Sequence, residues 1–184
     1  MPRPRQTFLY AGFISAIVLA NLPAAHGAQL PAPVTGDSYG LREVGAGTLS
    51  WLGRPVYEAS LWTTHGRFDG YTDGSPIALS LWYGRSFSRG QLLRITGTAW
   101  RLLEAGTPAQ RKEWLAALES VWRDVRPGDN QTTVVLPGKA TIFYDQLGLL
   151  GQIDDPEFGP AFLSIWLDSR SVVGDLRVQL LGAR

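Results

Sequence analysis

The sequence contains no cysteine, a single methionine and only two histidines. Without cysteine, the chain forms no disulfide, offers no thiolate to a metal and cannot carry a lipid on an N-terminal cysteine. Beyond the N-terminal segment His65 is the only histidine, and it sits in the polar stretch "TTHGRFDGYTDG". A transition-metal site would need carboxylates almost alone, and a Ser-His-Asp triad would need this one residue. We therefore predict no metal and no cofactor.

Charged side chains are also scarce, at 18% of the sequence, whereas 45% of the residues are hydrophobic. That balance favours one compact domain with a hydrophobic core over a disordered chain. No basic cluster with interleaved aromatic residues is present, so we predict no nucleic-acid partner. A dinucleotide fingerprint, a phosphate-binding loop and a "GxSxG" motif are absent as well.

The N-terminal segment has the three parts of a secretory signal peptide. Arg3 and Arg5 precede an apolar run over residues 8–22, and small residues follow. Cleavage after Gly27 places Ala25 and Gly27 at the small-residue positions, whereas an anchor would need about 20 apolar residues without such a cut site. We predict a signal peptide over residues 1–27, a flexible lead-in over 28–40 rich in Pro, Gly and small residues, and one domain over 41–184. No membrane span is expected after cleavage.

Three strands are predicted at the start of the domain. "GTLSWLG" and "RPVYEASLWTT" read as two strands joined by a tight turn at Gly53, and "PIALSLWYG" reads as a third. Side chains alternate across a strand, so Tyr57 and Leu61 share one face of the second strand, and Leu81 and Tyr83 share one face of the third.

A Ser two residues before a Trp occurs in both the second and third strands and again at Ser164. In a strand the two side chains lie on the same face. The third copy, in "FGPAFLSIWLD", has the spacing of a helix, where the two side chains point roughly 200° apart. We therefore interpret the third copy as a coincidence.

Two helices are predicted next. In "FSRGQLLRITGTAWRLLEAG" Ser88 can cap the N-terminus, Gly106 follows the end, and one side carries the apolar residues Leu92, Ile95, Ala99, Leu102 and Leu103. In "TPAQRKEWLAALESVWRDV" Thr107, Pro108 and Gln110 are typical of a capped start. We interpret its Trp114 and Trp122 as residues that pack on the sheet.

The rest of the chain predicts a β-meander over residues 131–153, a short helix that begins near Pro156 and a second one within "VGDLRVQLLG". Strands, two helices, strands and then helices indicate an α+β domain whose largely antiparallel sheet is covered by helices.

The segments "REVGAGTLSWLGRPVYEASLW", "ALSLWYGRSFSRGQL", "RPGD" and "DQLGLLGQIDDPEFGPAFLSIWLD" occur in this order. In these segments, over residues 41–184, the chain resembles the bacterial chalcone isomerase-like proteins, the secreted branch of a superfamily that includes plant chalcone isomerases and fatty-acid-binding relatives. The resemblance implies an open-faced β-sandwich in which helices cover a large antiparallel sheet and leave a cleft for an apolar ligand. With the signal peptide, it implies a periplasmic protein.

The resemblance does not extend to the catalytic residues. The plant enzymes use an Arg on the first core strand, a Thr on the next, a Tyr just before the first helix and an Asn seven residues later. Here Tyr57 falls at the Thr position, Phe87 at the Tyr position and Arg94 at the Asn position, and "GAGTLSW" offers Thr48 but no Arg. Without the phenol and the guanidinium, stabilisation of the developing oxyanion is lost, so chalcone cyclisation is disfavoured.

We therefore expect an exported, non-catalytic domain that binds an apolar or amphipathic small molecule such as a fatty acid. Its candidate ligand-binding residues are Tyr57, Leu61, Leu81, Tyr83, Phe87 and Arg94. Core packing remains open for the two tyrosines, and a solvated surface position remains open for Arg94. Trp100 is the expected fluorescent reporter of binding. The alternatives are an isomerase or intramolecular lyase with another substrate, and a protein-interaction module of an envelope assembly.

Overall fold

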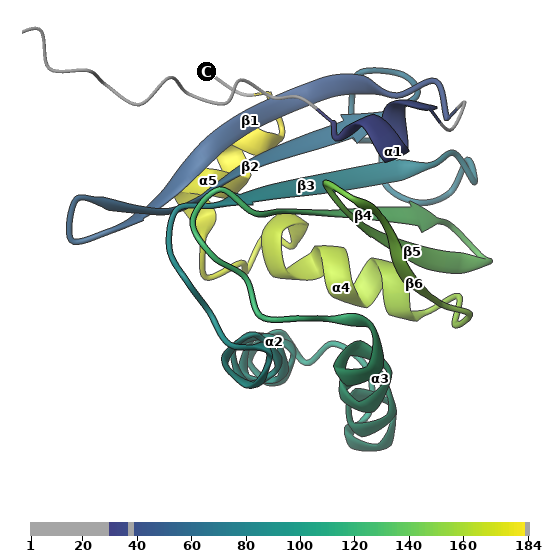
Figure 1. Ribbon diagram of the computed structural model, residues 1–184. Helices are drawn as coiled ribbons and strands as arrows, with labels where there is room; N and C mark the ends of the chain where they lie inside the picture. The colour runs from purple at the N-terminus through teal and green to yellow at the C-terminus, as the bar shows by residue number, and fades with distance from the viewer. Residues whose placement is uncertain (1–29, 37–38, 183–184) are drawn as a thin grey trace, which may run out of the picture.

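The computed structural model describes residues 30–36 and 39–182, and the predicted signal peptide and its cleavage site lie outside them. Within the described residues one six-stranded antiparallel sheet has its strands in chain order (Figure 1). The strands are β1 Arg42–Trp51, β2 Arg54–Thr63, β3 Ile77–Tyr83, β4 Asn130–Leu136, β5 Ala140–Asp145 and β6 Gly148–Ile153. The helices are α1 Ala32–Gly36, α2 Arg89–Leu103, α3 Pro108–Val121, α4 Phe158–Leu167 and α5 Gly174–Leu180. This arrangement confirms the predicted α+β class.

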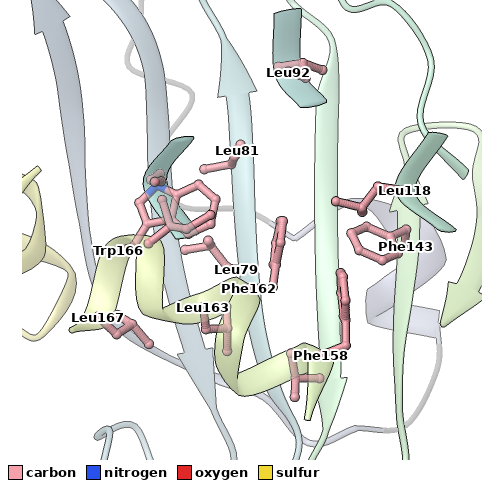
Figure 2. Packing of buried hydrophobic residues seen from close by; sticks show 14 of the residues in the cluster. Leu79, Leu81, Leu92, Leu118, Phe143, Phe158, Phe162, Leu163, Trp166 and Leu167 are labelled. Carbon is pink, nitrogen blue, oxygen red and sulfur yellow. The ribbon is translucent and has the colours of Figure 1, made fainter. Parts of the chain in front are cut away.

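Helices cover one face of the sheet. The helix α4 lies directly against β4 and β5, α5 lies against β1, and α2 packs on α4 (Figure 1). Figure 2 shows Phe158 and Phe162 of α4 pointing toward Phe143 of β5, with ring centroids 6.0 and 5.6 Å from that of Phe143. Edge-to-face aromatic pairs of this kind add to the free energy gained by burying the rings. The hydrophobic core therefore lies between the sheet and α4.

The helices α2 and α3 form an insertion between two strands that are neighbours in the sheet. Phe87 and Val125, at the two ends of the insertion, exchange backbone hydrogen bonds of 3.0 and 2.9 Å. Beneath them, the backbone N–H of Tyr83 donates to the carbonyl of Asp129 at 2.9 Å. The chain thus leaves and re-enters the sheet at one point.

Both helices of the insertion begin as predicted. The Ser88 hydroxyl accepts from the backbone N–H of Gln91 at 3.2 Å, and the Gln91 side chain accepts from the backbone N–H of Ser88 at 2.8 Å. Thr107 and Gln110 make the same reciprocal pair at the start of α3. Each capping box satisfies two N–H groups that the helix itself leaves unpaired.

The repeated Ser-Trp pattern has a different cause in the strands and in the helix. In β2 the indole N–H of Trp62 donates to the hydroxyl of Ser60 on the same sheet face at 2.9 Å. In α4 the hydroxyl of Ser164 instead donates to the carbonyl of Ala161 at 2.7 Å. The third copy is therefore a coincidence of letters, as predicted.

The opposite face of the sheet is partly covered by α1. Its Val34 is buried together with Ala78, Val134 and Tyr144 of the strands. This helix lies within the segment for which the sequence predicts a flexible lead-in.

The β1–β2 hairpin turns through only two residues, Leu52 and Gly53, with φ of 50° and 72°. Positive φ at both positions defines a type I′ turn, which favours Asn-Gly. Glycine adopts this conformation freely, but a left-handed backbone at an L-residue such as Leu52 costs about 1–2 kcal/mol. The predicted tight turn at Gly53 is confirmed, and it contains one strained leucine.

Candidate functional site

A cavity of about 640 Å³ lies on the helix-covered face of the sheet. The strands β2 and β3 form one wall, α2 a second and α4 a third. The central residues of these walls are Tyr57, Leu81, Tyr83, Leu92, Thr96, Ala99, Phe162, Ile165 and Trp166. Small-molecule sites in proteins have volumes of about 300–1,000 Å³ and mostly apolar walls, so the cavity is of that kind.

The structure brings together most of the residues selected from the sequence. Those that line the cavity are Tyr57, Leu81, Tyr83, Phe87 and Arg94. Leu61 does not, because it lies further along β2, opposite Leu79, where the helices pack directly on the sheet. Leu61 is fully buried and belongs to the hydrophobic core instead of the cavity wall. A role in ligand binding stays a prediction for the other five.

Tyr57 is a neutral hydrogen-bond donor in the wall. Its hydroxyl oxygen accepts from the indole N–H of Trp166 at 3.0 Å. An indole N–H only donates, so the phenolic proton of Tyr57 needs another acceptor, and no described residue supplies one within hydrogen-bonding distance. Burial raises the pKa of Tyr57 to about 12, so the group is un-ionised at neutral pH.

Tyr83 lies beside Tyr57, with ring centroids 6.4 Å apart. Its hydroxyl donates to the side-chain oxygen of Gln131 at 3.1 Å, which satisfies the phenolic proton. Burial and the neighbouring Tyr57 raise the pKa of Tyr83 above its usual value. Tyr83 thus both packs in the core and lines the cavity.

Two arginines lie at the entrance of the cavity. Arg94 of α2 is exposed and lines the opening, so its side chain is solvated, and its contact with a ligand stays a prediction. Arg85 follows β3, and its guanidinium lies 5.7 Å from the ring centroid of Phe87. A cation over an aromatic face is held there by the ring quadrupole. Among the described residues, none that lines the cavity is acidic.

Several lining residues differ from what the helical pattern predicts. Ile95 and Leu102 have the spacing of core residues, yet each is more than half exposed and lies at the cavity opening. The apolar stripe of α2 is therefore wider than the surface that α4 covers. Trp51 and Val172 complete the opening from distant parts of the chain, and no local signal in the sequence links them to it.

Trp100, the expected fluorescent reporter, does not line the cavity. Trp100 is fully buried behind the cavity, where its indole N–H donates to the carbonyl of Ala161 at 2.8 Å. The tryptophans that line the cavity are Trp51, Trp122 and Trp166. Trp122 also packs on Phe143 and Phe162, which confirms its predicted packing role. The prediction did not include its second position in the cavity wall.

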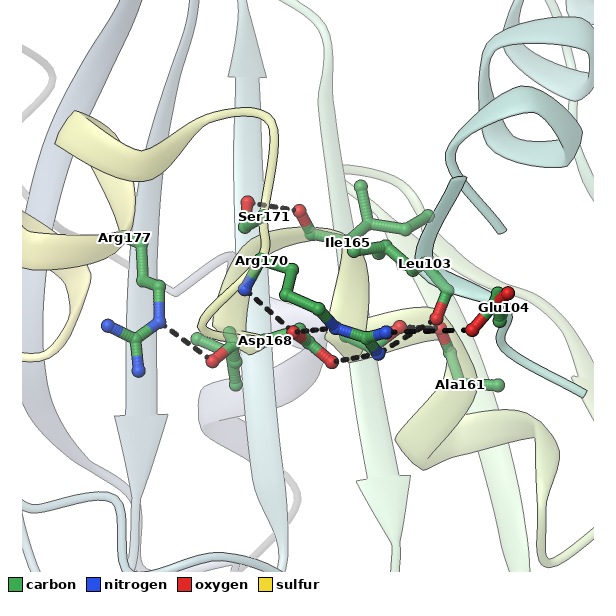
Figure 3. Close-up of polar contacts among 10 residues, drawn as sticks. Leu103, Glu104, Ala161, Ile165, Asp168, Arg170, Ser171 and Arg177 are labelled. Carbon is green, nitrogen blue, oxygen red and sulfur yellow. Dashed lines mark hydrogen bonds and ion pairs between the residues drawn. The ribbon is translucent and has the colours of Figure 1, made fainter. Parts of the chain in front are cut away.

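The connection between α4 and α5, which carries Val172 to the opening, is anchored by side chains (Figure 3). Arg170 donates to the carboxylate of Asp168 at 3.1 Å and to the carbonyl of Leu103, at the end of α2, at 2.9 Å. The side-chain bond from Arg170 holds the pKa of Asp168 below its usual value. The hydroxyl of Ser171 donates to the carbonyl of Ile165 at 2.7 Å. These bonds tie the loop to both α2 and α4.

An antiparallel sheet with one helical layer and an apolar cavity between them defines a class of open-faced α+β domains. A family model described as chalcone isomerase-like matches residues 23–182, and the chain belongs to that family. Among solved structures, a fatty-acid binding protein of Arabidopsis thaliana is similar, with 14% sequence identity and a TM-score of 0.59 over 83% of this chain and 95% of that chain. No curated protein matches the sequence. None of the described helices is both long and apolar enough to cross a membrane.

Proposed function

We propose that this chain is an exported binding protein that takes up an amphipathic molecule with a long hydrocarbon chain, such as a fatty acid, and catalyses no reaction on it. The observation that carries the proposal is the apolar cavity of about 640 Å³, which opens beside two arginines. The fold that the chain shares with a fatty-acid binding protein supports it.

The hydrocarbon chain of the ligand would occupy the inner part of the cavity. Leu81, Phe162 and Trp166 supply apolar surface there. Each buried CH₂ contributes about 0.8 kcal/mol, so a long chain gains more than an aromatic fragment of a few atoms. The apolar walls thus select for chain length.

The carboxylate would remain at the entrance, close to Arg94 and Arg85. A buried carboxylate needs a cation or several donors to offset its lost hydration, and Tyr57 provides only one neutral donor. The guanidinium of Arg94 lies at the opening and keeps contact with water. This orientation satisfies the charge without burying it.

The positions matched to the plant catalytic residues favour binding over catalysis. Phe87 lines the cavity where the enzymes have a phenol, and it offers no hydroxyl. On β1 the residue paired with Tyr57 is Leu49, which also lines the cavity and carries no charge. A developing oxyanion would therefore meet the hydroxyl of Tyr57, but neither a phenol at position 87 nor a guanidinium on β1.

Titration with a long-chain fatty acid is expected to change tryptophan fluorescence saturably, because Trp166 and Trp122 line the cavity. Replacing Arg94 by Gln should weaken binding by up to about fivefold, the upper end of the range for an exposed ion pair. Arg123→Gln, at an exposed position that does not itself line the cavity, is the matched control and should bind normally. A flat titration for fatty acids of every chain length would refute the proposed function.

Export is expected to remove residues 1–27, because the charged, apolar and small-residue parts of this segment have the order of a signal peptide. N-terminal sequencing of the protein from a periplasmic fraction should begin at Ala28. Recovery of the mature protein with Met1 retained would contradict both cleavage and the proposed location.

A further inference from the structure

Exposed apolar side chains gather around the opening of the cavity. Trp51 is 67% exposed and Leu52 is 88% exposed at the tip of the β1–β2 hairpin. Ile95 and Leu102 of α2 and Val172 of the α4–α5 loop are each more than half exposed. All of them except Leu52 line the same cavity, and Leu52 adjoins Trp51, so we call these five residues the mouth rim. Exposed apolar side chains gathered at one opening in this way are typical of an interaction site.

The hairpin tip keeps its apolar residue at a cost in stability. Leu52 has a left-handed backbone in a turn where asparagine would be favoured, and its side chain packs against little of the protein. In Figure 1 this hairpin extends past the other strands of the sheet. Among the described residues, the fold gives the side chain of Leu52 little burial to offset this cost. A leucine at this position is therefore better explained by contact with a surface outside the chain.

Cations surround the mouth rim. Arg85 and Arg94 line the opening, and Arg54 pairs across the hairpin with Trp51. Arg101 donates to the hydroxyl of Thr98, a lining residue, at 3.3 Å. The helix α2 contains three arginines and no acidic residue. This side of the molecule therefore presents positive charge without compensating carboxylates in α2 or in the cavity wall.

We propose that the mouth rim docks on an anionic lipid bilayer, with Trp51 and Leu52 in the interface and the arginines at the headgroups. Tryptophan and leucine beside basic side chains are typical of surfaces that lie in a membrane interface, and each arginine gains from the negative surface potential. In the docked protein the cavity opening would face the lipid, and an amphipathic ligand could pass from the bilayer into the cavity without crossing water. The transfer of a ligand from the lipid rests on the proposed function, whereas the docking on the bilayer does not depend on it.

The experiment is co-sedimentation of the purified protein with vesicles of phosphatidylcholine, with and without phosphatidylglycerol, and without added fatty acid. We expect partitioning onto the anionic vesicles that weakens as salt is raised, because exposed charges are screened. Leu52→Asn should reduce this partitioning roughly tenfold, because the docked protein would no longer bury a leucine side chain in the membrane interface. The same substitution should raise the melting temperature, since asparagine suits the turn. A variant that binds vesicles more weakly but melts at a higher temperature has lost a membrane contact and has not lost its fold.

Leu147→Asn is the matched control. Leu147 is also a turn leucine, 84% exposed, but it lies between β5 and β6, away from the mouth rim. All variants have the same N-terminal residues, so any effect of the N-terminus on lipid binding is the same in each. A difference between Leu52→Asn and Leu147→Asn therefore comes from the β1–β2 hairpin. Wild-type partitioning of Leu52→Asn, equal losses in both variants, or equal binding to neutral vesicles would overturn the proposal. No partitioning onto either vesicle would also overturn it. Fatty-acid titration without vesicles tests the proposed function separately.

Discussion

Replacing Ala99 by Phe is expected to abolish most binding of a long-chain ligand while the protein remains folded. Ala99 is buried on α2 and its side chain lines the cavity. A phenyl group there would occupy space that two or three methylene groups of a ligand would fill. At about 0.8 kcal/mol for each CH₂, the loss is about 2 kcal/mol, or roughly thirtyfold in affinity. The measurement is a fluorescence titration with fatty acids of increasing chain length.

The matched control is Ala116→Phe, the same change at an exposed position of α3 outside the cavity. It should bind the ligand normally. Circular dichroism and thermal melting must show that Ala99→Phe keeps its fold. Unchanged affinity in a folded Ala99→Phe protein would mean that the ligand binds elsewhere.

Trp100→Ala is expected to lower the free energy of unfolding by about 3–5 kcal/mol, because it removes a fully buried aromatic side chain. The ring of Trp100 packs edge-to-face on Trp114 and Phe158, with centroids 5.4 and 6.0 Å away. The carbonyl of Ala161 keeps a partner, since it also accepts from Ser164. The cost therefore comes from the cavity left behind. Urea denaturation followed by circular dichroism measures it.

Trp51→Ala makes the same substitution at an exposed tryptophan and serves as the control for the buried Trp100. Trp51 is mostly exposed at the hairpin tip, and substitutions at such positions usually change stability by less than about 0.5 kcal/mol. The two variants should differ by several kcal/mol. Similar destabilisation in both would contradict the packing described for Trp100.

The fold was predictable where signals are local. The capping boxes at Ser88 and Thr107 locate two helices, because the residues that cap an N-terminus lie within four positions. The turn at Gly53 and the alternation around Leu81 locate strands for the same reason. The short helix α1 was missed, since its burial depends on contacts with distant strands such as β5.

The site was predictable only in part. Strand alternation correctly placed Tyr57 and Tyr83 on the cavity face. It could not show where along the strand the cavity ends, so Leu61 was included although the core closes over it. Helical spacing placed Ile95 on the apolar side of its helix, but spacing cannot show how much of that side α4 covers. Val172 reaches the opening through bonds of Arg170 and Ser171, which are contacts between residues far apart in the chain.

The backbone pairing between Phe87 and Val125 has a consequence for how a ligand could enter. Both ends of the two-helix insertion pass through this single neck, and the strands on either side of it are already hydrogen bonded to each other. An outward swing of α2 and α3 about the neck would therefore break their packing on α4 and β6 and the side-chain hydrogen bonds of Trp100, Trp114 and Arg170, but no rung of the sheet. We expect the two helices to open as a cooperative unit of their own while the sheet stays native. Widening of the cavity would cost only the contacts of these two helices.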